Sequence, residues 1–106
     1  MQIDERNYLS QLFDTYGKLL SSKQFEVMDT FLNYDLGESE IAESTNGSRQ
    51  SVHDAFNKAK NQLFEFEKKC GFLNEQEVQK NKLIEAKSLL KNGKTDAAVK
   101  ILDEII

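Results

Sequence analysis

The sequence predicts an all-α fold, and three observations lead to this prediction. The chain of 106 residues has no proline, no tryptophan and only five glycines, so few residues interrupt a helix. Apolar residues recur at intervals of three and four along most of the chain, which is the spacing of one helix face. Capping residues stand where these patterns stop and restart. This length allows one compact helical domain with an additional helical arm.

Two helices are predicted at the start of the chain. An apolar stripe from Tyr8 to Leu20 indicates a first helix over about residues 5–19. Ser21 and Gln24 have the spacing of a capping box, so we expect a second helix to start at Ser21. The buried stripe of this second helix continues through Phe25, Met28, Phe31 and Leu32.

A short third helix is predicted from Glu38 to about Ser44. Residues 35–37 break the helical pattern, and Gly37 can act as the N-cap of the new helix. Ile41 and Ala42 are expected to face inward.

A long fourth helix is predicted over about residues 49–70. Asn46 and Gly47 tolerate left-handed backbone and Ser48 is a good N-cap, so the chain turns and restarts at once. Helical spacing then continues until Gly71, which is suited to a C-cap. Its expected inward residues are Val52, Ala55, Phe56, Ala59, Leu63, Phe66 and Cys70.

The last third of the chain predicts a helical hairpin. One helical pattern ends at Gly93, and Thr95 is expected to cap a final helix that runs to Ile106. A single hairpin of this kind cannot bury its own apolar face, so we expect it to pack on the rest of the chain or on a second copy. We therefore predict a domain at residues 1–70 and a hairpin arm, for packing or dimerisation, at residues 71–106.

Composition argues against several classes of function. With one cysteine and one histidine, the chain can form neither an internal disulfide nor the usual His/Cys zinc site, and we expect no metal and no cofactor. Cys70 is interpreted as a small buried hydrophobe and not as a reactive thiol. No stretch approaches the roughly 18 apolar residues that span a bilayer, so we expect a cytoplasmic protein without membrane insertion. Glu38, Glu40 and Glu43 are interpreted as surface charge, and we expect no enzyme.

The net charge of −4 and the acidic sequence pI argue against a general affinity for nucleic acid, but the charge is unevenly distributed. Residues 1–47 carry three basic and nine acidic side chains, whereas residues 48–69 carry five basic and three acidic ones. Residues 70–106 are balanced, with six of each sign. The one basic stretch therefore coincides with the predicted fourth helix.

The segment ESEIAESTNGSRQSVHDAF has the arrangement of a helix-turn-helix. Ala42 is small where two helices would cross, Asn46 and Gly47 form the turn, Ser48 caps the next helix, and Val52 returns to the core. A generic helical hairpin is the alternative interpretation of this window.

If the motif binds nucleic acid, the start of the fourth helix supplies the contacts. Arg49, Gln50, His53 and Asn57 can reach base edges and phosphates, and further phosphate contacts can come from Lys58, Lys60 and Lys69. The alternative is a solvated helix face, since Asp54 in the same turn repels phosphate.

Residues 19–63 resemble region four of bacterial sigma factors, the module that reads promoter DNA. With the flanking YLSQLFDTYGKLL helix, the stretch SRQSVHDAFNKAKNQLFEFEKK and a helical tail, most of the chain resembles the YlxM family of small bacterial proteins. This resemblance implies a dimeric helix-turn-helix protein with a role in the signal recognition particle pathway. The implied role rests on gene neighbourhood and not on chemistry.

The sequence is compatible with three functions. The first is a regulatory or accessory protein of the signal recognition particle, in which the motif docks a protein or an RNA. The second is a transcription regulator that binds DNA as a homodimer, and the third is an adaptor without a nucleic-acid partner. A homodimer is expected because the apolar surface exceeds what one thin helix layer covers, at Phe64, Phe66, Phe72 and Leu73.

Overall fold

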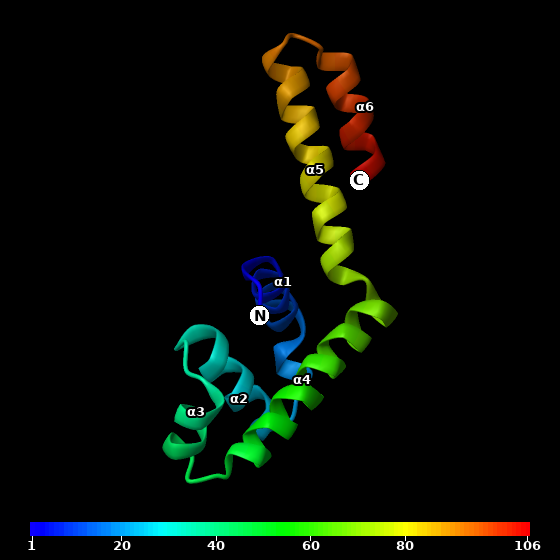
Figure 1. Ribbon diagram of the computed structural model, residues 1–106. Helices are drawn as coiled ribbons and strands as arrows, with labels where there is room; N and C mark the ends of the chain where they lie inside the picture. Colours follow the sequence, from blue (N-terminus) through cyan, green and yellow to red (C-terminus); the bar gives the residue numbers. More distant parts are fainter. The chain divides into compact units, whose positions relative to one another are not determined.

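The computed structural model describes residues 1–106, and its helical content confirms the all-α prediction. It contains six α-helices, one 3-10 helix and no strand (Figure 1). The chain divides into two compact units, which we call unit 1 (Met1–Gly71) and unit 2 (Phe72–Ile106). In chain order the helices are α1 (Ile3–Tyr16), the 3-10 helix (Gly17–Leu19), α2 (Ser22–Asn33), α3 (Glu38–Ser44), α4 (Arg49–Cys70), α5 (Phe72–Lys91) and α6 (Thr95–Ile105).

The first helix differs from its predicted range. It starts two residues earlier than expected, at Ile3, and its α-helical part ends at Tyr16. Residues 17–19 form a 3-10 turn, after which Leu20 is extended and leads into the cap of α2. The apolar stripe does not stay buried through this turn, since Leu19 is 63% exposed, and burial resumes at Leu20.

Three predicted helix boundaries in unit 1 are confirmed by their hydrogen bonds or backbone angles. The Ser21 hydroxyl accepts from the Gln24 amide at 3.2 Å, and the Gln24 side chain accepts from the Ser21 amide at the same distance. The Ser48 hydroxyl accepts from the Ser51 amide at 3.0 Å. Gly71 ends α4 in the left-handed region, at φ 66°. The two serine caps satisfy N–H groups that a helix start leaves unpaired, whereas Gly71 ends a helix.

Unit 1 contains nearly all of the core. Helices α1, α2 and α3 each contact α4. Thirteen buried apolar residues belong to this unit, and they include Leu12, Met28 and Leu63 with no exposed surface. The long helix α4 is therefore the element against which the other helices of unit 1 pack.

Arg6 joins the start of α1 to the end of α2. Its guanidinium donates to the Phe31 carbonyl at 2.9 Å, pairs with Asp35 at 3.1 Å and lies 4.6 Å from the centre of the Phe31 ring. Asp35 has a φ of 55°, so this contact holds the chain where it turns from α2 toward α3. This turn thereby sets where α3, the first helix of the motif, begins.

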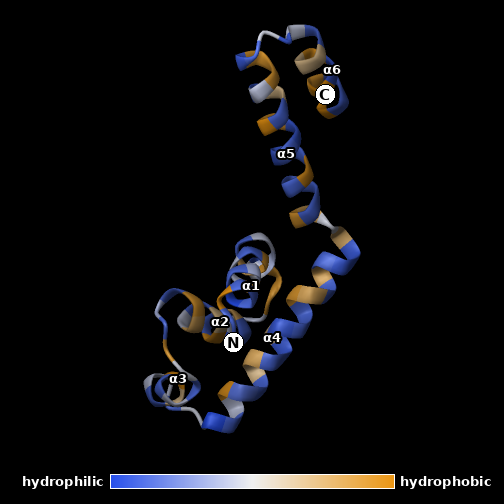
Figure 2. Ribbon diagram, turned by 45° about the horizontal axis from the view of Figure 1, so that its top comes forward, coloured by the Kyte–Doolittle hydropathy of each residue, from blue (hydrophilic) through white to orange (hydrophobic).

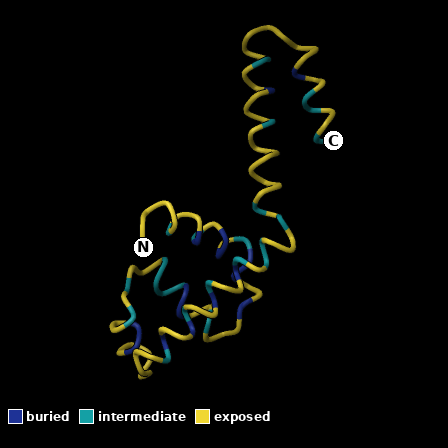
Figure 3. The backbone as a smooth tube through the Cα atoms, turned by 45° about the vertical axis from the view of Figure 1, so that its right-hand side comes forward, coloured by how far each residue is buried: buried dark blue, intermediate teal, exposed yellow.

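Unit 2 is a hairpin of α5 and α6 with little buried surface. The chain reverses at Gly93, whose φ of 76° suits glycine. The prediction that Thr95 caps α6 is wrong: Lys94 is the N-cap, it has no side-chain cap bond, and Thr95 is the first helical residue. Only Ala86 and Ala98 are buried, and Figure 3 shows the hairpin largely exposed.

The prediction that Cys70 is buried is also wrong. Burial along α4 ends at Leu63, Phe66 is half-buried, and Cys70 is exposed. The helical spacing persists to Cys70, but a residue in the last turn of a helix is buried only if another element covers it. None of the six helices has the length and apolar character needed to cross a membrane.

Candidate nucleic-acid interface

Helices α3 and α4 form the predicted helix-turn-helix. Their crossing encloses a small apolar cluster in which Ile41 and Ala42 of α3 meet Val52 and Ala55 of α4, together with Val27 of α2. Each of these five side chains is more than nine-tenths buried. The short side chain of Ala42 allows the close approach of α3 and α4 that the sequence predicted.

The turn between the two helices is held by hydrogen bonds. The Thr45 hydroxyl donates to the Ile41 carbonyl at 2.8 Å, and the Gly47 amide donates to the Ala42 carbonyl at 2.9 Å. Asn46 has a φ of 54°, in the left-handed region that asparagine tolerates. The turn therefore fixes the direction in which α4 starts.

Four of the predicted contact residues lie on the exposed start of α4, and the structure links two of them directly to one carboxylate and a third through the His53 ring. Glu38, the first residue of α3, accepts from His53 Nδ1 at 2.8 Å and lies 4.0 Å from Arg49. The other ring nitrogen of His53 is 3.0 Å from the Asn57 amide. Arg49 is nevertheless 74% exposed and His53 48% exposed, so a ligand can reach both.

The other predicted contact residues do not share these contacts with Glu38 and His53. The Gln50 amide donates to Asp54 at 3.0 Å on the same helix. Lys60 lies farther along α4 and donates to Glu5 of α1 at 2.8 Å. This hydrogen bond and the positive charge of Lys60 lower the pKa of Glu5 below its usual value. Lys60 is therefore engaged within unit 1, away from the start of α4.

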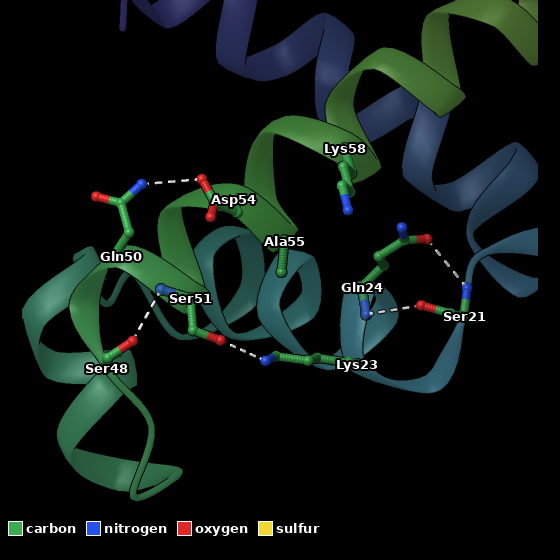
Figure 4. A pocket seen from close by; sticks show the side chains of 9 residues that line it. All are labelled: Ser21, Lys23, Gln24, Ser48, Gln50, Ser51, Asp54, Ala55 and Lys58. Carbon is green, nitrogen blue, oxygen red and sulfur yellow. Dashed lines mark hydrogen bonds between the residues drawn. The ribbon is translucent and has the colours of Figure 1, made fainter.

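Lys58 lines a different part of the surface. A cleft of about 460 Å³ lies between the first turns of α2 and α4, and Lys58 borders it opposite Lys23 (Figure 4). We call this the α2–α4 cleft; its lining residues are Ser21, Lys23, Gln24, Ser48, Gln50, Ser51, Asp54, Ala55 and Lys58.

Two residues of this surface were missed or misread from the sequence. The sequence predicts Glu38 only as surface charge, whereas in the structure it pairs with residues 11 and 15 positions later. No pattern in the sequence indicates a role for Lys23, which bonds Ser51, 28 positions away. No local pattern reports such pairs, because both depend on how α3 and α2 cross α4. The position of Glu38 at the start of α3 was the only available signal.

Comparison with known proteins places the chain in a family. The model of the family UPF0122, described as "Putative helix-turn-helix protein, YlxM / p13 like", matches residues 3–104. A UPF0122 protein of Acetivibrio thermocellus is 42% identical over 74 residues, which are 70% of this chain and 63% of the relative. A UPF0122 protein of Clostridium kluyveri is 41% identical over 81 residues, which are 76% of this chain and 73% of the relative.

The aligned part of this chain thus spans less than two thirds of the Acetivibrio relative. A UPF0122 protein of Malacoplasma penetrans is 43% identical over 65 residues, 61% of each chain. The family model nevertheless extends over nearly the whole chain and agrees with the helix-turn-helix that α3 and α4 form. The chain therefore belongs to the UPF0122 family of helix-turn-helix proteins related to YlxM and p13.

Proposed function

We propose that the chain is an accessory protein of the signal recognition particle pathway that binds the particle's RNA through the start of α4. The pathway comes from the resemblance to the YlxM family. The binding surface, which we call the α4 face, consists of Arg49, Gln50, His53 and Asn57.

The polar character of the α4 face favours a nucleic acid as its ligand. Between Asp35 and Gly71 the structure has no large hydrophobic side chain among its exposed residues. Protein interfaces depend on a few buried aromatic or apolar anchors, and this face offers none. Amide, imidazole and guanidinium groups instead match the edges and phosphates of nucleotides.

The position of Glu38 favours RNA over sequence-specific reading of duplex DNA. Its carboxylate faces Arg49 and His53, so it opposes the dense phosphate charge that flanks a major groove. Unpaired bases in RNA loops offer amino groups that a carboxylate accepts, and flat faces on which arginine and histidine stack. The net charge of −4 weakens non-specific attraction to DNA and RNA alike, so it favours a ligand that is recognised through its bases.

The second candidate is a transcription regulator that binds DNA as a dimer. The observation that favours it is the motif itself, which presents Arg49 and Gln50 in the first turn of the second helix. Two such helices in successive major grooves would require a twofold arrangement of two chains.

We propose that unit 2 provides this dimer contact. Leu83 and Leu90 lie seven residues apart on one stripe of α5, and both are about half exposed. Glu75 and Glu77 lie near the start of α5, whereas Lys87 and Lys91 lie near its end. Antiparallel pairing of α5 with a second copy would place acidic beside basic residues. Two hairpins would then bury their apolar stripes in a four-helix bundle.

Affinity capture of the tagged chain from its own cells, with and without nuclease, tests the proposal. We expect the RNA of the signal recognition particle to be retained and to disappear after ribonuclease treatment. Enrichment of discrete DNA fragments that only deoxyribonuclease removes would favour the second candidate. Capture that neither nuclease alters would point to an adaptor without a nucleic-acid partner.

A further inference from the structure

The α2–α4 cleft combines positive groups from two helices. Lys23 belongs to the first turn of α2, and Lys58 lies in the third turn of α4. The N-caps of both helices, Ser21 and Ser48, line the same cleft. Its volume of about 460 Å³ falls within the range of roughly 300–1,000 Å³ that is common for ligand sites.

These two lysines differ from the other cations of the motif because no carboxylate pairs with them. Arg49 is paired with Glu38 and Lys60 with Glu5. Lys23 donates to the Ser51 hydroxyl, which is neutral, and Lys58 forms no hydrogen bond or ion pair. Both ammonium groups therefore keep their charge available for an anion.

One carboxylate, that of Asp54, borders the cleft and reduces its positive charge. It accepts the Gln50 amide at 3.0 Å, and Figure 4 shows it directed toward Gln50. In the same view Lys58 and the Gln24 side chain point toward each other across the cleft. Two ammonium groups against one rim carboxylate leave the cleft positive.

The backbone adds to this charge. The hydroxyls of the two N-caps occupy only the amides of Gln24 and Ser51. The first amides of each helix have no acceptor within the helix, and the positive ends of the two helix dipoles meet at the cleft. Both features favour an anionic group.

We infer that the α2–α4 cleft binds a phosphodiester group of a nucleic-acid backbone, with Lys23 and Lys58 on either side of the phosphate. This inference rests on the proposed function for the identity of the ligand. The cleft would position the strand, and the neighbouring α4 face would contact its bases. Lysines act here as point charges, so the cleft would accept the phosphate of any sequence.

The test uses two short probes, the trinucleotides UpUpU and TpTpT, in an NMR titration of the whole chain. We expect both to shift the backbone amides of Lys23, Gln24 and Ser51, which line the cleft and are not part of the α4 face. A difference between the two probes would report on the 2′-hydroxyl or on the thymine methyl group, because the phosphodiester is common to both. The absence of shifts at these amides would overturn the inference, whatever the α4 face binds.

Lys58→Gln removes one charge and keeps a good helix former, so the fold should be unaffected. We expect this variant to weaken trinucleotide binding and to lower the salt dependence by about 0.7–0.9 in the slope of log K against log salt, the loss of one phosphate contact. Lys68→Gln is the matched control, because Lys68 is also exposed on α4 but lies outside the cleft. Equal losses in both variants would overturn the inference.

These experiments distinguish a failure of the cleft as a phosphate site from a failure of the proposed function. If the cleft amides shift but the particle's RNA is not bound, the proposed function fails and the cleft stands. If the RNA is bound and Lys58→Gln has no effect on affinity or salt slope, the cleft fails and the α4 face stands. Asp54→Asn gives a check of opposite sign, since removal of the rim carboxylate should strengthen binding.

Discussion

Unit 1 and unit 2 are built from the same kind of amphipathic helix but bury very different amounts of it. Thirteen of the fifteen buried apolar residues lie in unit 1, and only Ala86 and Ala98 lie in unit 2. Figure 2 shows hydrophobic and hydrophilic residues alternating along α5 and α6 as they do along α4. The difference comes from the number of helices within each unit, because three helices pack against α4 in unit 1 whereas unit 2 consists of α5 and α6 alone. Amphipathic pattern alone therefore does not report whether a helix face is covered.

The largest expected effect is on the core of unit 1. Leu63→Ala should lower the free energy of unfolding by about 2–5 kcal/mol, because Leu63 is fully buried and the change leaves a cavity. Leu90→Ala in unit 2 should cost far less within one chain, since Leu90 is about half exposed. Urea unfolding of both variants, followed by circular dichroism at low protein concentration, measures the contrast. Equal losses would contradict the difference between the two units.

The second prediction concerns the exposed stripe of unit 2. Leu83→Lys should raise the dissociation constant of the proposed homodimer by more than roughly tenfold, because it places a charge in the proposed apolar contact. Ile84→Lys is the control, since Ile84 is also about half exposed but is turned by about 100° around α5. Sedimentation equilibrium distinguishes the two variants. A monomeric wild-type chain at all concentrations, or equal weakening by both variants, would exclude this contact.

The third prediction compares a serine that caps a helix with a serine that does not. Ser48→Ala should destabilise unit 1 by about 1 kcal/mol, because the Ser51 amide loses its acceptor at the start of α4. Ser88→Ala in the last turn of α5 replaces an exposed serine by a better helix former and should be neutral or slightly stabilising. Thermal unfolding of both variants provides the measurement. A neutral Ser48→Ala variant would mean that the cap does not stabilise the start of α4.

The smallest expected effect comes from the pair of Glu5 and Lys60. Because Lys60 lowers the pKa of Glu5 in the folded chain, the pair adds stability above the ordinary glutamate pKa. That contribution is lost as the pH falls through the folded-state pKa. The stability difference between wild type and Glu5→Gln should therefore be small at neutral pH and vanish in acid. A difference that grows as the pH falls would contradict this sign.

Local signals predicted most of the fold, and contacts between helices account for what they missed. The caps at Ser21 and Ser48 depend on atoms three residues away, so the sequence reports them directly. The predictions that Cys70 is buried and that Thr95 caps α6 are wrong, because both features depend on which element lies nearby. The same reasoning explains why the partners of the candidate site were not predicted. Arg49 and His53 were recognised by residue type, whereas Glu38 reaches them only through the crossing of α3 and α4.

The central claim is that the α4 face binds RNA and that Arg49 contributes to this binding. The most direct measurement is the affinity of purified wild-type and Arg49→Ala chains for the particle's RNA and for a pool of DNA duplexes, each over a range of salt concentrations. We predict preferential binding of the RNA, with a loss of about 1–3 kcal/mol in the variant if Arg49 contacts a base, or a salt slope lower by about 1 if it contacts a phosphate. Equal affinity and equal salt slope for the two chains, or preference for a discrete DNA sequence, would contradict the account.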